Sequence, residues 1–181
     1  MTRMRMREPA AVVLLSAATW SCAGGPPPPA PLDTRSDMCA FCRMTVSVQR
    51  LAGQIVAPSE EPKFFDDIGC LRDYLRQHPQ LTTGSVSYVA DHRTGEWVDA
   101  SRAVFTRTRA VQTPMASGLI AHADASSRDR DSDAAGGSDV SPAAILGPLA
   151  AGSPARQPRG GAAAGSPARQ PRGGARRGGA R

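Results

Sequence analysis

The sequence predicts a small α+β domain, and two patterns in its central part carry this prediction. Short apolar, β-branched runs recur between residues 44 and 123 at the length and spacing of strands. One amphipathic helix is expected at residues 67–78, where apolar side chains recur at helical spacing and His78-Pro79 ends the run. The order of strands around this helix is typical of a β-β-α-β unit.

The individual elements follow from local residue patterns. Asp66 or Asp67 stands where a helix N-cap is wanted. Residues 44–49 and 51–57 are close enough in sequence to form a hairpin. The strands of the first set are expected at 44–49, 51–57, 63–66 and 85–90. A second, weaker set is expected at 96–100, 103–106 and 119–123, with a Pro/Gly-containing loop at 112–118.

The net charge of +6 belongs to the two ends of the chain. Residues 1–21 hold three Arg and one Glu, and residues 128–181 hold nine Arg and four Asp. Residues 22–127 hold ten basic and eleven acidic side chains. A folded region with so little net charge has no basic face for nucleic acid, so no nucleic-acid partner is expected.

The first 36 residues indicate export and tethering. Arginines precede a short apolar run that ends at Cys22, which predicts a signal peptide over residues 1–21. The cysteine after a small residue resembles the lipobox of bacterial lipoproteins, in which that cysteine is lipidated; an ordinary secretory signal is the alternative. Residues 22–36 are rich in Gly and Pro and predict an extended tether.

The residues with the clearest chemistry are a Cys-x-x-Cys motif and a methionine two residues later, Cys39, Cys42 and Met44. Thiolates and thioethers are soft donors that suit Cu(I). The spacing alone leaves open a redox dithiol, a structural disulfide or half of a zinc site. If residues 44–49 form a strand that begins at the motif, Cys42 and Met44 point to the same face.

The rest of the chain weakens two of these alternatives. A thioredoxin-type site needs the motif at a helix N-terminus, and here it precedes a predicted strand. A zinc site needs a second ligand pair at short spacing, and the remaining candidates are isolated. The first of them is Cys70, which we interpret as a core thiol. The others are His78, a helix C-cap; His92, a solvent-facing turn residue; and His122, a strand residue.

Three ordered blocks, at residues 39–46, 65–71 and 105–118, resemble the NosL family, the copper-binding accessory lipoproteins of nitrous-oxide reductase. The blocks read Cys-Ala-Phe-Cys-Arg-Met-Thr-Val, Phe-Asp-Asp-Ile-Gly-Cys-Leu and, ending the third, Thr-Pro-Met-Ala-Ser-Gly. The resemblance implies a fold of organomercurial-lyase-like β-β-α-β repeats. It also implies a small lipoprotein that binds Cu(I) and passes it to the apo-reductase.

The resemblance also implies a ligand set. The Cys-x-x-Cys-Gly-Met pattern of the family falls on Cys39, Cys42 and Met44, with Arg43 in place of the usual glycine, and its Pro-Met falls on Met115. The last helix and strand of the family should follow residue 125, where this chain becomes rich in Arg, Gly, Pro and Ala. We therefore expect an incomplete second unit, and a disordered tail over residues 128–181.

These inferences combine into one prediction. Residues 37–127 form a NosL-like copper-binding domain on an outer-membrane lipoprotein that faces the periplasm, anchored through Cys22. Its metal ligands are Cys39, Cys42, Met44 and Met115. It is not an enzyme, and its partners are apo nitrous-oxide reductase and the associated maturation machinery. The alternative function is a thiol-disulfide oxidoreductase or thiol-dependent lyase that uses the two motif cysteines.

Overall fold

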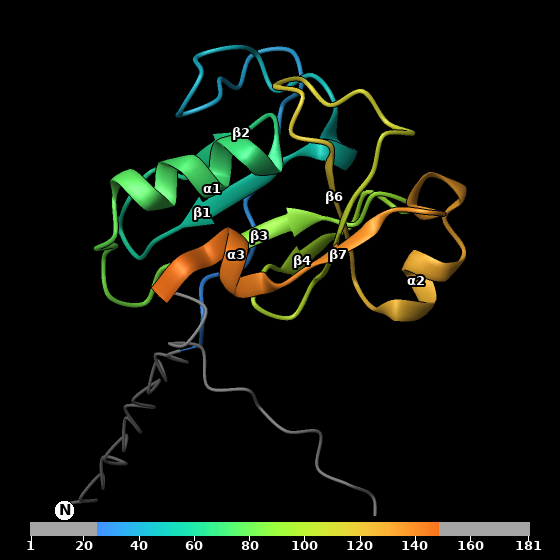
Figure 1. Ribbon diagram of the computed structural model, residues 1–181. Helices are drawn as coiled ribbons and strands as arrows, with labels where there is room; N and C mark the ends of the chain where they lie inside the picture. Colours follow the sequence, from blue (N-terminus) through green and yellow to red (C-terminus); the bar gives the residue numbers. More distant parts are fainter. Residues whose placement is uncertain (1–24, 149–181) are drawn as a thin grey trace, which may run out of the picture.

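The computed structural model describes residues 25–148, which fold as two successive β-β-α-β units (Figure 1). The first unit contains β1 (Gly53–Val56), β2 (Lys63–Phe65), α1 (Ile68–Gln77) and β3 (Val86–Ala90), and β4 (Trp97–Asp99) follows it. The second contains β5 (Val104–Arg107), β6 (Leu119–His122), α2 (Ala125–Asp129) and β7 (Ser138–Val140), followed by α3 (Pro142–Leu146). Short 3₁₀ turns lie at η1 (Gln49–Leu51) and η2 (Ser132–Ala134). The predicted α+β class is confirmed.

Each unit contributes one antiparallel sheet. The first has the strand order β2-β1-β3-β4, and the second has the order β6-β5-β7. Figure 1 shows α1 lying across β1 and β2, with α3 beside it. The apolar face of α1 packs against these strands. Residues of both units form the main hydrophobic core. Its largest fully buried side chains are Phe65, Phe105, Ile68, Leu71, Leu119 and Ile145.

The second unit is complete, which corrects the expectation of an incomplete repeat and of a domain that ends at residue 127. Asp124 caps α2 by accepting from Ser127 N. Ser141 caps α3, with Pro142 at its start. Ile145 and Leu146 are buried against the core. Polar, Gly-rich composition concealed these elements because they are short and rely on caps and a few apolar contacts.

The N-terminal boundary also differs from the prediction of a free tether over residues 22–36. The hydroxyl of Tyr88 donates to the carbonyl of Pro27 at 2.6 Å, and the side chain of Gln54 exchanges two hydrogen bonds with the backbone of Ala30. Ala30 and Leu32 pack against the core. The proline-rich segment is extended, as its composition predicts, but it lies against the first sheet.

The strand expected at residues 44–49 is absent, and so is its hairpin with residues 51–57. Thr45 forms one isolated bridge with Met38, and residues 49–51 form the 3₁₀ turn η1. β1 instead pairs with β2 on one side and β3 on the other. The alternation of apolar residues over 44–49 predicted a strand, but only Val46 is buried there, between exposed neighbours. The segment forms no ladder of strand hydrogen bonds.

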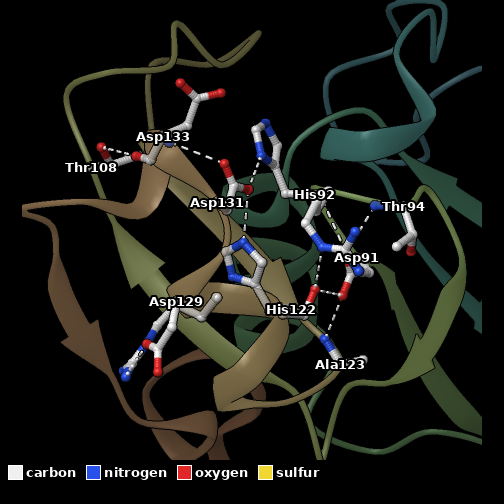
Figure 2. Close-up of polar contacts among 12 residues, drawn as sticks. Asp91, His92, Thr94, Thr108, His122, Ala123, Asp129, Asp131 and Asp133 are labelled. Atoms are coloured by element: carbon white, nitrogen blue, oxygen red, sulfur yellow. Dashed lines mark hydrogen bonds and ion pairs between the residues drawn. The ribbon is translucent and has the colours of Figure 1, made fainter.

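Asp91 joins the two units where β3 meets β6. Its backbone forms a parallel bridge with Ala121. Its carboxylate accepts hydrogen bonds from the second unit, from Ala123 N at 2.8 Å and Ser127 Oγ at 2.7 Å, and from the backbone of Arg93 and Thr94 (Figure 2). Burial would raise the pKa of Asp91, but these donors outweigh it and lower the pKa to about 2.

Among residues 25–148, no helix combines the length and apolar character needed to cross a membrane. The predicted signal peptide and the predicted lipidation site, Cys22, lie outside the described residues, as does the repetitive sequence from residue 149 onward.

We expect Asp91→Asn to lower the free energy of unfolding by about 2 kcal/mol at neutral pH, because the lowered carboxyl pKa favours the folded state by that amount. A carboxyl with a lowered pKa stabilises the fold above pH about 4 and loses this contribution as the pH falls toward 2. Urea unfolding at several pH values should therefore show the gap between wild type and variant closing below pH about 4. The control is Asp129→Asn, at an exposed carboxylate. A gap that does not depend on pH would contradict the role given to Asp91.

Candidate metal centre

Three cysteine thiols and one carboxylate meet at the edge of the first unit. Cys39 and Cys42 come from the loop before η1, Cys70 from the first turn of α1, and Asp66 from the junction of β2 and α1. One ligand atom from each residue lies within 4.8 Å of all the others. All three thiols are free. The prediction brought Cys39 and Cys42 together; the structure adds Cys70 and Asp66.

The loop that carries the two motif cysteines is a tight reversal of the chain. Cys39 N donates to Met44 O at 2.7 Å, and Arg43 N donates to Cys39 O at 3.0 Å. Ala40 N donates to the carbonyl of Phe64 in β2 at 2.8 Å, which fixes the loop to the sheet. The reversal requires a left-handed residue, and Arg43 occupies that position with φ 68°. Glycine adopts this conformation without strain.

The register of this reversal corrects the predicted pairing of Met44 with Cys42. The bridge between Met38 and Thr45 places Met44 opposite Cys39, and residues opposite each other share a face. The side chain of Met38 belongs to the other face by alternation. Cys42 reaches the cluster from the turn itself, where its thiol donates to Asp66 Oδ1 at 3.3 Å.

Residues 65–70 supply the other half of the cluster, and four of them have separate roles. Asp66 faces the thiols, and Cys70 follows one helical turn later. Asp67 is the N-cap of α1, as predicted, and accepts from Gly69 N at 2.6 Å. Gly69 permits close packing, because a Cβ there would lie 2.7 Å from the Cβ of Ser117.

Asp67 also holds the loop that carries Met115. Its second oxygen accepts from Met115 N at 2.9 Å, and its first oxygen accepts from the hydroxyl of Ser117. Met115 and Cys70 therefore line one cavity of about 300 Å³, together with Phe41 and the start of α1. Asp67 and Met115 are 48 residues apart in sequence, and spacing alone gave no sign of this contact.

Burial separates the thiols from the thioethers. Cys39 and Cys70 are buried and Cys42 is half-buried. Met44 and Met115 are 52% and 46% exposed. The two methionine side chains are therefore accessible from solvent, and the thiols of Cys39 and Cys70 are enclosed.

The hydrogen bonds among the thiols set their ionisation. The hydrogen bond from Cys70 lowers the pKa of Cys39 to about 6, although burial acts in the opposite direction. Burial is the main cause that raises the pKa of Cys42 to about 11. The contact with Cys39, together with burial, raises the pKa of Cys70. Cys39 is therefore the thiol of the cluster that loses its proton most easily.

One atom of the cluster lacks a partner. Asp66 Oδ2 is buried and accepts no hydrogen bond from the part of the chain that the structure describes. Buried polar atoms are almost always satisfied, because an unpaired one costs about 1–3 kcal/mol. A cation held among the thiols would satisfy this oxygen electrostatically.

The histidines lie apart from this group of ligand atoms. His78 is the C-cap of α1, as predicted, where its ring stacks on Tyr74. His92 was expected to face solvent but is buried at 8% exposure. His122 lies in β6 as predicted and is fully buried. Both contact Asp131 rather than the cysteines (Figure 2).

Comparison with known proteins gives one family match. The NosL family model matches residues 30–145, which is more than half of the chain. A crystal structure of the copper chaperone NosL from Shewanella denitrificans is similar at 16% sequence identity, with 55% of this chain and 83% of that chain covered and a TM-score of 0.46. No curated protein sequence matches.

We expect Arg43→Gly to raise the free energy of unfolding by about 1 kcal/mol, since a non-glycine residue at positive φ costs about 1–2 kcal/mol and glycine gives back part of that in unfolded-state entropy. Chemical denaturation of the reduced, metal-free protein measures the difference. Arg35→Gly, at another exposed arginine in a loop, is the control and should not stabilise. A destabilised Arg43→Gly protein would contradict the loop geometry.

Proposed function

This chain belongs to the NosL family, and we propose that it is a carrier of copper(I) that binds the ion at Cys39, Cys42 and Cys70 and exchanges it through Met44 and Met115. The single observation that carries the proposal is the meeting of three reduced thiols, from two separate segments, beside half-exposed methionines. Thiolate and thioether ligands select Cu(I) over hard divalent ions.

Ionisation supports uptake at neutral pH. A Cys39 thiol with a pKa of about 6 is already a thiolate, so it can bind the cation without first losing a proton. Binding then favours loss of the protons on Cys42 and Cys70, since metal ligands must be deprotonated. The single positive charge of Cu(I) compensates for one of the two protons that leave, and the unpaired oxygen of Asp66 gains a nearby cation.

Release would proceed by ligand exchange. The thioethers of Met44 and Met115 carry no proton, and both lie where a partner's sulfur ligands could reach an ion. Hydrogen bonds to Asp67 hold the backbone of the loop of residues 113–118 against α1, so it is the half-exposed side chain of Met115 that can reorient toward a partner. Copper would pass one ligand at a time to the partner.

The receiving partner we propose is apo nitrous-oxide reductase together with its maturation machinery, as the family resemblance implies. The chain would act at the periplasmic face of a bacterial outer membrane, anchored by a lipid on Cys22. The lipobox-like sequence before Cys22 and the extended proline-rich segment after it support this arrangement. The proposed role involves no catalysis.

A thiol-disulfide oxidoreductase is the second candidate, favoured by the lowered pKa of Cys39. The arrangement of the thiols suits this function less well than it suits metal binding. The nucleophilic thiolate would be Cys39, which is fully buried, whereas the more accessible Cys42 has a raised pKa. Oxidoreductases need a low-pKa thiolate that the substrate disulfide can reach.

Titration of the reduced protein with Cu(I) against a competing chelator tests the carrier. We expect one tightly bound ion, with Cys39→Ala and Cys70→Ala each weakening binding by about 100-fold or more and Met115→Ala by at least about tenfold. The matched control is Met38→Ala, because Met38 is 56% exposed on the same loop but faces away from Cys39.

Two results would count against the carrier. Unchanged affinity in Cys70→Ala would remove Cys70 from the ligand set. Turnover of a disulfide substrate by the metal-free protein, lost in Cys39→Ala, would favour the oxidoreductase instead.

A further inference from the structure

A second group of metal-binding side chains lies where the two units meet, and it contains no sulfur. It consists of His92, His122 and Asp131, whose ligand atoms all lie within 4.8 Å of one another. Figure 2 shows both imidazole rings directed at the Asp131 carboxylate. His92 Nδ1 lies 2.7 Å from Asp131 Oδ2, and His122 Nε2 lies 2.9 Å from the same oxygen.

Three separate elements hold these side chains in place. His92 follows β3, and its backbone N donates to Ala121 O at 2.8 Å. His122 is the last residue of β6 and is paired with Val104 in β5. Asp131 caps the 3₁₀ turn η2, where its other oxygen accepts from Asp133 N at 3.0 Å. The group is therefore fixed by the backbone on three sides.

The surroundings favour a cation. The segment that carries Asp131 holds two further carboxylates, Asp129 and Asp133, and Asp91 lies next to His92. The two arginines of this segment are engaged elsewhere: Arg128 pairs with Asp129 and Asp139, and Arg130 donates to Ser126. Burial acts to raise the pKa of Asp131, and hydrogen bonds from His122 and His92 outweigh it and lower that pKa.

Hydrogen bonding alone leaves this group incompletely satisfied. His122 is fully buried, and its Nδ1 has no partner among residues 25–148. A metal on Nε2 leaves Nδ1 without a partner, so it is the contacts with Asp131 that favour a metal. Both imidazoles share one carboxylate oxygen, although two would serve them better. Two imidazoles and one carboxylate are a usual three-ligand set for Zn²⁺, and the same nitrogen and oxygen donors suit Cu²⁺.

We propose that His92, His122 and Asp131 form a second metal site, for a divalent cation of the Zn²⁺ and Cu²⁺ class, distinct from the thiol cluster. Ligand atoms around tetrahedral Zn²⁺ stand about 3.3 Å apart, so each imidazole nitrogen needs to move about half an ångström away from Asp131 Oδ2. The proton on each contacting ring nitrogen moves to the other nitrogen of that ring, which frees a lone pair for the metal. The bound ion joins β3, β6 and the η2 loop, and so fastens one unit to the other.

Zinc titration of a protein without thiols tests this site. In the variant with Cys22, Cys39, Cys42 and Cys70 changed to Ser, calorimetry should find one Zn²⁺ per chain. Adding Asp131→Asn or His92→Gln should weaken binding by about 100-fold or more. The control is His78→Gln, since His78 is the one histidine of the chain outside the proposed site and is exposed.

A second measurement keeps the test decisive if the cysteine-free variant does not fold. X-ray absorption at the zinc edge of the wild-type protein, with its thiols first saturated by Cu(I), should show nitrogen and oxygen neighbours and no sulfur. Three results would each overturn the proposal: sulfur neighbours around the zinc, no bound zinc, or zinc binding that survives both Asp131→Asn and His92→Gln. The group would then be a set of hydrogen bonds that joins the two units.

Discussion

The carboxylate of Asp67 connects the parts of the candidate metal centre that are far apart in sequence. It caps α1 through Gly69 N, and the same side chain accepts from Met115 N and from the hydroxyl of Ser117. The helix cap positions Cys70, and the contacts to the loop position Met115, so one side chain sets the distance between two proposed ligands. Gly69 completes the joint, because any larger residue would push Ser117 away.

The two candidate sites offer different chemistry for different tasks. Thiols and thioethers at the edge of the first unit suit a soft ion that must be released again, and their rim of half-exposed methionines keeps the ion accessible. Imidazoles and a carboxylate at the joint between the units are enclosed by β3, β6 and η2. An ion held there would act on stability rather than on transfer, which is why the two proposals can fail independently.

The sequence predicted most of the first unit, because α1 has a clear helical period and its N-cap is Asp67. It failed where the structure depends on long-range contacts. Residues 27–32 have no strand pattern, but Tyr88 and Gln54 hold them against the sheet. Residues 125–146 have the composition of a tail, yet Asp124 and Ser141 cap helices there and Ile145 reaches the core.

For the metal centre, the motif spacing identified Cys39, Cys42 and Met44, and the resemblance added Met115. Cys70 was interpreted as a core thiol because a single cysteine has no spacing to interpret; only the turn from β2 into α1 brings it to the motif. His92 was misplaced for a related reason. A residue in a polar turn is usually exposed, but here the second unit, which the sequence did not predict in full, covers it.

X-ray absorption at the copper edge of the protein loaded with one equivalent of Cu(I) tests the central claim most directly. The account predicts sulfur neighbours only, with one fewer sulfur in Cys70→Ala and no change in His122→Gln. A spectrum with the multiple-scattering pattern of imidazole, or one that is the same in Cys70→Ala as in the wild type, would contradict it.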